Sequence, residues 1–205
     1  LIAETQTGHV MGAAQDGTIA FKGIPFARPP VGALRWRAPQ PAASWDGVRT
    51  ASDYGADCMQ NPFEADAAPL RTEPAEDCLY LNVWKPEDAG PGSDLPVLVW
   101  IYGGGWVNGG TSPAVYDGTA TAEKDVVFVS FNYRLGRFGF FAHPALTAAD
   151  EDDGRLGNYG YMDQVAALEW VRDNIEAFGG DPDAVTIMGE SAGGGSVANL
   201  MTIEP

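Results

Sequence analysis

Three short apolar runs stand out in the second half of the chain. Residues 97–102 form a continuous run, residues 126–131 form a second, and residues 185–188 form a third, shorter one. Runs of this kind are expected of central strands whose two faces are both buried. We therefore predict three neighbouring strands of a sheet in this part of the chain.

A helical pattern lies between the second and third runs. Apolar residues recur there at three- or four-residue spacing, as on one face of a helix: Val165, Leu168, Val171, Ile175 and Phe178. Gly179 and Gly180 follow as a stop signal. Strand, crossover and strand in this order are typical of a mostly parallel sheet in an α/β protein.

The first half of the chain favours short strands joined by turns. Residues 7–11 and 18–23 are strand candidates, and residues 79–84 alternate as a strand does. Residues 25–36 contain three prolines and should form an extended loop. Together the two halves predict a mixed, mostly parallel sheet with antiparallel N-terminal strands and crossover helices.

Charge narrows the range of partners. The chain carries 12 basic and 28 acidic residues, a net charge of −16. Such a chain repels phosphate backbones and anionic membranes, so we expect no nucleic-acid partner. No apolar run reaches membrane-spanning length, and the N-terminus lacks the pattern of a signal peptide. A length of 205 residues suits one domain with a sizeable core.

The strongest chemical signal is a GxSxG motif. Gly189, Glu190, Ser191, Ala192 and Gly193 follow a predicted strand and precede a plausible helix. This context is that of a nucleophile elbow, in which a strained serine is lifted above the sheet. Strand and helix approach closely there, so the residues two positions away must lack side chains. We predict that Ser191 is a nucleophile rather than part of an ordinary glycine-rich turn.

A second signal is a run of three glycines after the first buried strand. Gly103, Gly104 and Gly105 could direct backbone N–H groups at one point, where they would hold the oxyanion of a tetrahedral intermediate. A phosphate-binding loop would end in Gly-Lys-Ser/Thr, whereas Trp106 follows here. Trp106 could line an acyl pocket or belong to the core.

With these motifs the chain resembles the type-B carboxylesterases, the carboxylesterase and cholinesterase-like family of the α/β-hydrolase fold. The matching segments are FKGIPFA (21–27), PPVG (29–32), EDCLYLN (76–82), WIYGGG (100–105), NYR (132–134), GNYG (157–160), DQ (163–164) and FGGDP (178–182). They run in order through nearly the whole chain and end at the elbow. The resemblance implies a serine carboxylic-ester hydrolase that acts on a small-molecule ester through an acyl-enzyme.

The resemblance also implies roles for single residues. It makes Ser191 the nucleophile and assigns the N–H groups of Gly104, Gly105 and Ala192 to the oxyanion hole. It places Glu190 near the bottom of the active-site cleft, although an acid that merely holds the elbow is equally compatible with its position. It requires no metal and no organic cofactor.

The two cysteines, Cys58 and Cys78, lie 20 positions apart. Taken alone they could be free thiols, ligands or a disulfide, although two cysteines without a nearby histidine make a poor zinc site. The resemblance implies a Cys58–Cys78 disulfide. A disulfide would point to an oxidising compartment, hence a secreted or periplasmic protein, although a cytoplasmic esterase could carry the same cysteines reduced.

The catalytic triad is incomplete in this sequence. In this fold the order is serine, acid, histidine. Only 14 residues follow Ser191 and none is histidine, while His9 and His143 both precede it. Members of the family are more than twice as long, so we interpret residues 1–205 as the N-terminal portion of a single catalytic domain, truncated after the elbow. The acid and histidine should lie downstream, and this portion alone should be inactive.

The residues also bear on specificity and on a rival function. Cholinesterases place a tryptophan between the two cysteines to hold choline, and none lies there in this chain. The alternative to an esterase is a non-catalytic binding or adhesion module with the same fold, but such relatives lack the serine that Ser191 provides. The ester itself and the oligomeric state are not predicted.

Finally, the resemblance suggests two buried ion pairs that brace the site. They are Arg35 with Glu76 and Arg134 with Asp163. A guanidinium among apolar neighbours would be costly without a partner. The acidic run at residues 150–153 is interpreted as a solvated loop rather than a calcium site, because it lacks the spacing of an EF-hand.

Overall fold

The computed structural model describes residues 1–63, 65–149, 152 and 154–203. Its larger sheet has six strands in the spatial order β3-β4-β6-β8-β7-β9. Their bounds are β3 (Ala13–Gln15), β4 (Thr18–Pro25), β6 (Tyr80–Pro86), β7 (Leu95–Ile101), β8 (Val127–Phe131) and β9 (Gly180–Gly189). The three apolar runs therefore form neighbouring strands, as predicted.

The sheet is mixed, but parallel pairs do not dominate it. Among the described strands β3–β4, β4–β6 and β6–β8 are antiparallel, whereas β8–β7 and β7–β9 are parallel. Within this sheet, parallel pairing is thus confined to β7, β8 and β9. A smaller sheet combines β1 (Ile2–Thr5), β2 (Gly8–Met11) and β5 (Val48–Thr50) in the order β1-β2-β5.

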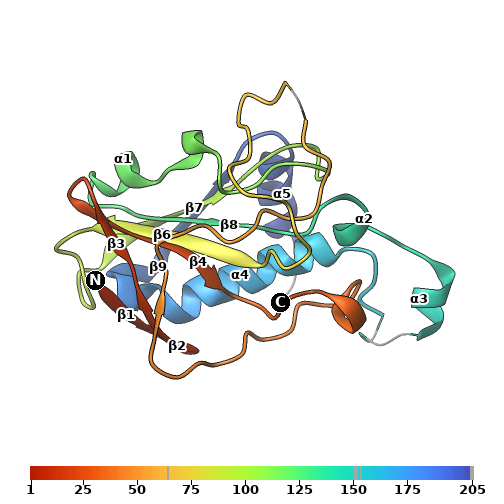
Figure 1. The fold of residues 1–205 in the computed structure, drawn as a ribbon, viewed down its shortest axis with the longest axis horizontal. Coiled ribbons are helices and arrows are strands. Elements are labelled where there is room, and N and C mark those ends of the chain that lie inside the picture. The colour runs from red at the N-terminus through yellow and green to blue at the C-terminus, as the bar shows by residue number, and fades with distance from the viewer. Residues whose placement is uncertain (64, 150–151, 153, 204–205) are drawn as a thin grey trace.

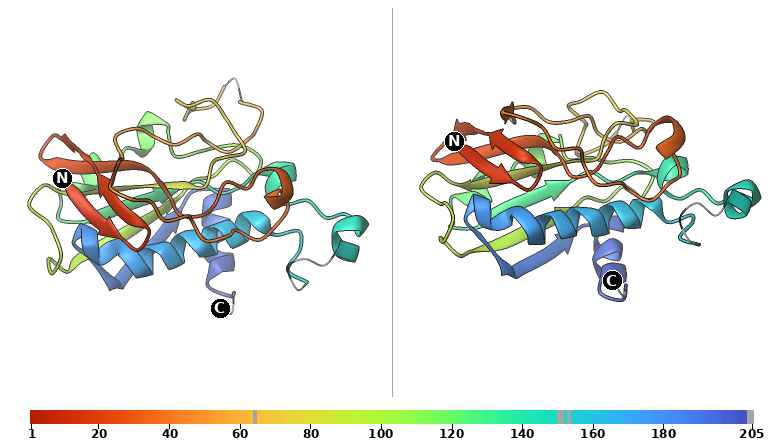
Figure 2. Two further views of the ribbon diagram at one scale, coloured as in Figure 1. Left: turned by 60° about the horizontal axis from the view of Figure 1, so that its bottom comes forward. Right: turned by 90° about the horizontal axis from the view of Figure 1, so that it is seen from below.

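The helices lie mainly in the second half of the chain. They are α1 (Thr119–Ala122), α2 (Gly136–Gly139), α3 (Pro144–Ala149), α4 (Tyr159–Asn174) and α5 (Ala192–Leu200), with 3₁₀ turns at Gly32–Leu34, Ala114–Tyr116 and Ile175–Phe178. Figure 2 shows α4 lying along one face of the larger sheet. α4 is the crossover between β8 and β9, and α5 leaves the end of β9.

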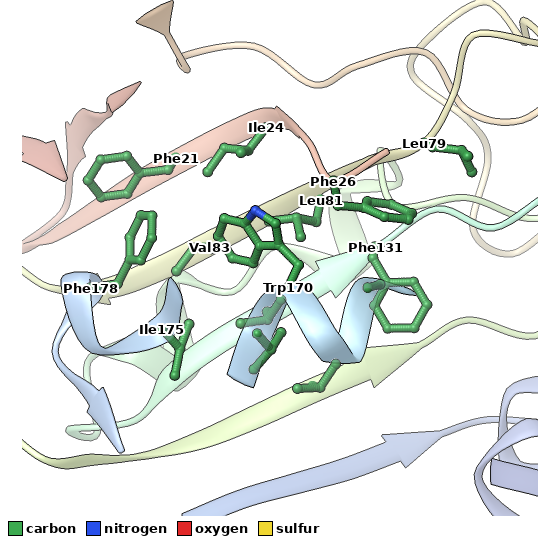
Figure 3. Packing of buried hydrophobic residues seen from close by; sticks show 14 of the residues in the cluster. Phe21, Ile24, Phe26, Leu79, Leu81, Val83, Phe131, Trp170, Ile175 and Phe178 are labelled. Atoms are coloured by element: carbon green, nitrogen blue, oxygen red, sulfur yellow. The ribbon is translucent and has the colours of Figure 1, made fainter. Parts of the chain in front are cut away.

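The main core fills the space between α4 and the central strands (Figure 3). The Phe21 ring of β4 and the Phe178 ring lie nearly perpendicular with their centroids 4.9 Å apart, and Trp170 of α4 packs on Phe178. Burying a side chain of this size contributes roughly 1.5–3 kcal/mol. The core therefore fixes α4, and with it the start of β9, against the sheet.

The apolar face predicted for residues 165–178 is buried in part: Val171, Ile175 and Phe178 are buried, whereas Val165 and Leu168 are half-buried. Leu168 still packs against the main core. The prediction that β9 is buried on both faces was wrong, and Met188 is 39% exposed. β9 is the last strand in the order of the described sheet, so no described strand pairs with its outer edge.

Candidate active site

Ser191 has the backbone of a nucleophile elbow. It stands between the end of β9 and the start of α5, with φ 54° and ψ −120°. A Cβ atom on Gly189 would collide with the carbonyl of Gly193, and one on Gly193 would collide with the carbonyl of Ile101. Only glycine fits at both positions, so the GxSxG spacing has the steric cause that the sequence suggested.

The glycine loop meets this elbow because of the sheet's topology. β7 and β9 are parallel neighbours with Ile101 opposite Gly189, so the segments after both strands leave the same edge of the sheet. A Cβ atom on Gly103 would lie 3.0 Å from Ser191 Cβ and 2.6 Å from Glu190 Oε2. Gly104 and Gly105 have φ of 103° and 62°, values that side chains rarely tolerate. The loop thus passes directly against Ser191.

The Ser191 side chain is exposed, and its hydroxyl has no hydrogen-bond partner among the described residues. The two histidines are engaged elsewhere: Nδ1 of His143 accepts a hydrogen bond from the Ala145 N–H at 3.1 Å, and His9 lies 3.9 Å from Glu4. Neither is placed as a general base. The N-terminus of α5, which starts at Ala192, directs its dipole toward the elbow, where it would favour an oxyanion.

Glu190 is exposed beside Ser191, with its carboxylate over the backbone of Gly103. Burial, and after it the charge of Glu190, raise the pKa of Tyr116. Glu190 is therefore close enough to Tyr116 for its charge to contribute to that shift.

A polar contact behind the loop was missed by the sequence analysis. Ser196 of α5 is buried, and its Oγ accepts hydrogen bonds from Trp106 Nε1 and from Gln164 Nε2 of α4, each at 3.1 Å. The indole of Trp106 thereby joins the glycine loop to both helices. Trp106 also lines a surface hollow with Gly105, so it serves both as packing and as pocket wall. No motif marks Ser196, and the DQ match that includes Gln164 does not indicate this contact, because the contact arises only where the two helices meet.

Both predicted ion pairs form, each through two hydrogen bonds. Arg134 donates to Asp163 at 2.8 and 2.7 Å, and the two side chains are 3% and 0% exposed. Arg35 donates to Glu76 at 2.6 and 2.5 Å, but these side chains are 37% and 22% exposed. The prediction of burial is therefore confirmed for the first pair and wrong for the second, which lies at the edge of the proline-rich loop.

Cys58 and Cys78 form a disulfide, with Cα atoms 4.9 Å apart. Both residues are buried in the main core. The bond closes the segment that carries Glu76, as the resemblance implied.

The acidic run is not simply solvated. Asp152 is 7% exposed and accepts hydrogen bonds from Arg37 and from the Ala38 N–H. Desolvation would raise its pKa, but the hydrogen bonds from Arg37 and Ala38 outweigh it and hold the pKa of Asp152 below its ordinary value. The other three acids of the run lie outside the described residues.

Comparison with known proteins now decides the family. The sequence profile described as the Carboxylesterase family matches residues 1–205. The chain belongs to the carboxylesterase family. It is 48% identical to the fumonisin B1 esterase of Sphingopyxis macrogoltabida and 46% identical to the para-nitrobenzyl esterase of Bacillus subtilis, with 98% of this chain covered in both alignments.

Solved structures of esterases resemble this chain closely in fold. A para-nitrobenzyl esterase matches with a TM-score of 0.87 at 44% identity, and a carboxylesterase of Geobacillus stearothermophilus with a TM-score of 0.86 at 46% identity; each match covers 98% of this chain. The fold is therefore that of the α/β-hydrolases. The chain spans 40% of each of these two structures and 37% and 40% of the two curated relatives.

Among the described residues, no helix combines the length and the apolar composition of a membrane span. Within the same residues no group of three or more His, Cys, Asp or Glu side chains could hold a metal ion.

Proposed function

We propose that the protein is a serine carboxylic-ester hydrolase in which Ser191 is the nucleophile. The observation that carries the proposal is the strained Ser191 backbone lying directly against the Gly103–Gly105 loop. A hydroxyl raised at a strand-to-helix turn, beside glycines free of side chains, suits nucleophilic attack on a carbonyl. Membership of a family with relatives named as esterases supports the same reaction.

The reaction would proceed through an acyl-enzyme. Ser191 Oγ forms a bond to the ester carbonyl carbon while its proton passes to a histidine base. The backbone N–H groups of Gly104, Gly105 and Ala192 hold the resulting oxyanion. When the tetrahedral intermediate collapses, the bond to the alcohol breaks and the alcohol leaves with that proton. Water then attacks the acyl-enzyme while the histidine takes a proton from it. The histidine returns this proton to Ser191 Oγ as the acid leaves.

Neither His9 nor His143 is the base of this reaction. We propose that the catalytic histidine and its acid partner both come from chain beyond residue 205. Residues 1–205 are then the N-terminal portion of one catalytic domain. Gly104, Gly105 and Ala192 as the oxyanion hole, and Glu190 as a modulator of its charge, are parts of this proposal. The reaction needs no metal or organic cofactor.

We also propose a secreted or periplasmic location, since disulfides such as Cys58–Cys78 form and persist in oxidising compartments. The substrate class is a small-molecule ester. The alternative of a non-catalytic binding module draws no support from the relatives named above.

A serine-directed phosphonate separates enzyme from binding module. In the full-length protein the phosphonate should label one serine stoichiometrically, and peptide mass spectrometry should find the adduct on Ser191. Heat-unfolded protein is the control, because an unfolded serine is not activated. Absence of labelling in the folded, full-length protein would contradict the proposed function.

A further inference from the structure

A side-chain amide joins the loop closed by the Cys58–Cys78 disulfide to the segment that follows the Gly103–Gly105 loop. Gln60 lies two residues after Cys58 and is half-buried. Its Nε2 donates to the Gly109 carbonyl at 2.6 Å, and its Oε1 accepts from the Gly109 N–H at 2.8 Å. Nε2 also donates to the Cys58 carbonyl at 2.9 Å. Only a side chain that both donates and accepts can hold both sides of one peptide residue in this way.

Gly109 is in turn packed against the start of the glycine loop. A Cβ atom on Gly109 would lie 2.6 Å from the Gly103 carbonyl oxygen, and its own backbone has φ 111°. The Gly104 carbonyl accepts hydrogen bonds from the N–H groups of Val107 and Asn108, each at 3.1 Å. The turn that ends at Gly109 therefore fixes the peptide orientation of Gly104.

The far end of this segment is held by Asp57, the residue directly before Cys58. Asp57 is fully buried, and its carboxylate accepts hydrogen bonds from the Thr111 N–H at 2.9 Å, from the Ser112 N–H at 3.3 Å and from Thr72 Oγ1 at 2.7 Å. Residues 109–112 are thus attached to the residues on either side of Cys58. In Figure 1 the orange-to-yellow loop between the cysteines lies beside the segment that follows β7.

We infer that Gln60 is a positioning residue for the oxyanion hole: its amide holds Gly109, and through Gly109 the peptide units of Gly104 and Gly105. The inference rests on the proposed function, because it assigns the two glycines a role in the reaction. Oxyanion donors act only when they are fixed in advance at the point where charge develops. A loop of glycines cannot fix itself, since its backbone is unusually free. Gln60 supplies the missing constraint without touching the substrate.

The test replaces Gln60 by Met, which keeps length and volume but removes the three hydrogen bonds. Gln40→Met is the matched control: Gln40 is also half-buried and also donates to the carbonyl two residues before it, but no described hydrogen bond links it to residues 103–112. A second variant, Gln60→Glu, keeps the acceptor for the Gly109 N–H and loses the donor. All variants are made in the full-length protein, and active sites are counted by phosphonate titration.

We expect kcat per active site for a simple aryl ester to fall about tenfold or more in Gln60→Met, with KM little changed. Affinity for a trifluoromethyl ketone, which forms a tetrahedral adduct, should fall by the same factor. Gln60→Glu should show the same pattern, and Gln40→Met should leave kcat unchanged.

A purely structural role would reduce the number of active sites or the melting temperature while kcat per active site stayed at the wild-type value, and that result would overturn the inference. If Gln60→Met does not fold, Gln60→Glu decides by the same criteria. Wild-type protein that neither hydrolyses esters nor reacts with the phosphonate would instead refute the proposed function.

Discussion

Two regions of the molecule each contain a bidentate ion pair, Arg134–Asp163 and Arg35–Glu76, but the two pairs differ in burial. The first lies between β8 and α4, where both side chains are almost completely buried, and Asp163 also accepts a hydrogen bond from the Arg134 N–H at 3.0 Å. The second joins the proline-rich loop to the residues before Cys78, and water reaches both groups. The more exposed pair has the slightly shorter hydrogen bonds, yet the loss of one partner should cost far more stability in the buried pair.

The largest loss in the free energy of unfolding is expected from Arg134→Met. The change leaves Asp163 buried without its cation and should cost about 3–5 kcal/mol of the free energy of unfolding, measured by urea denaturation at neutral pH. The double variant Arg134→Met/Asp163→Leu should recover much of this loss, because it removes the buried charge, although the Arg134 N–H then lacks its acceptor. A single variant as stable as wild type would show that the pair is not structurally important.

The same variant should have a pH signature. Burial raises the pKa of the Asp163 carboxyl, and the Arg134 guanidinium opposes that rise. Without Arg134 the folded state should hold the Asp163 proton to higher pH than the unfolded state does. The destabilisation should therefore be smallest at acidic pH and grow as pH rises through the raised pKa.

A smaller effect is expected from replacing both Cys58 and Cys78 by Ser. The disulfide closes a loop of about 20 residues, and its loss should lower the free energy of unfolding by about 2–4 kcal/mol through the greater freedom of the unfolded chain. Reduction of the wild-type protein should lower the melting temperature similarly, and the variant itself should not respond to reductant. If reductant destabilised both equally, the bond would not be the cause.

The smallest loss in the free energy of unfolding is expected from Arg35→Met. Because Arg35 and Glu76 are partly solvated, either can be left alone without burying a bare charge. The loss of unfolding free energy should be less than half of that for Arg134→Met, and added salt should reduce it further. A double-mutant cycle with Glu76→Gln measures the coupling directly. Coupling as large as that of Arg134 with Asp163 would remove the distinction between the two regions.

The sequence predicted those features that are local or sterically forced. Gly189 and Gly193 flank Ser191 because strand, elbow and helix leave no space for a side chain, so the spacing alone predicts the geometry. The buried pair of Arg134 with Asp163 was predicted only through resemblance to a family, since nothing in the chain between them marks the contact.

Other features depend on which surfaces meet in three dimensions. The family resemblance suggested that the Arg35–Glu76 pair is buried, but at the edge of the loop both side chains are partly exposed. Helical periodicity did not show that Asp163 and Gln164 of α4 would be fully buried. Gln60 carries no motif, and its contact with Gly109 exists only because the disulfide-closed loop crosses the glycine loop. Long-range polar contacts of this kind are not visible in hydrophobic periodicity.

Hydrolysis of a simple aryl ester by full-length Ser191→Ala shows whether Ser191 is the nucleophile. Ser191 is exposed and its hydroxyl makes no hydrogen bond in the described part of the chain, so its loss should leave the melting temperature unchanged. We predict that kcat falls by at least about 10⁴-fold. A folded Ser191→Ala variant that hydrolyses the ester at the wild-type rate would contradict the account.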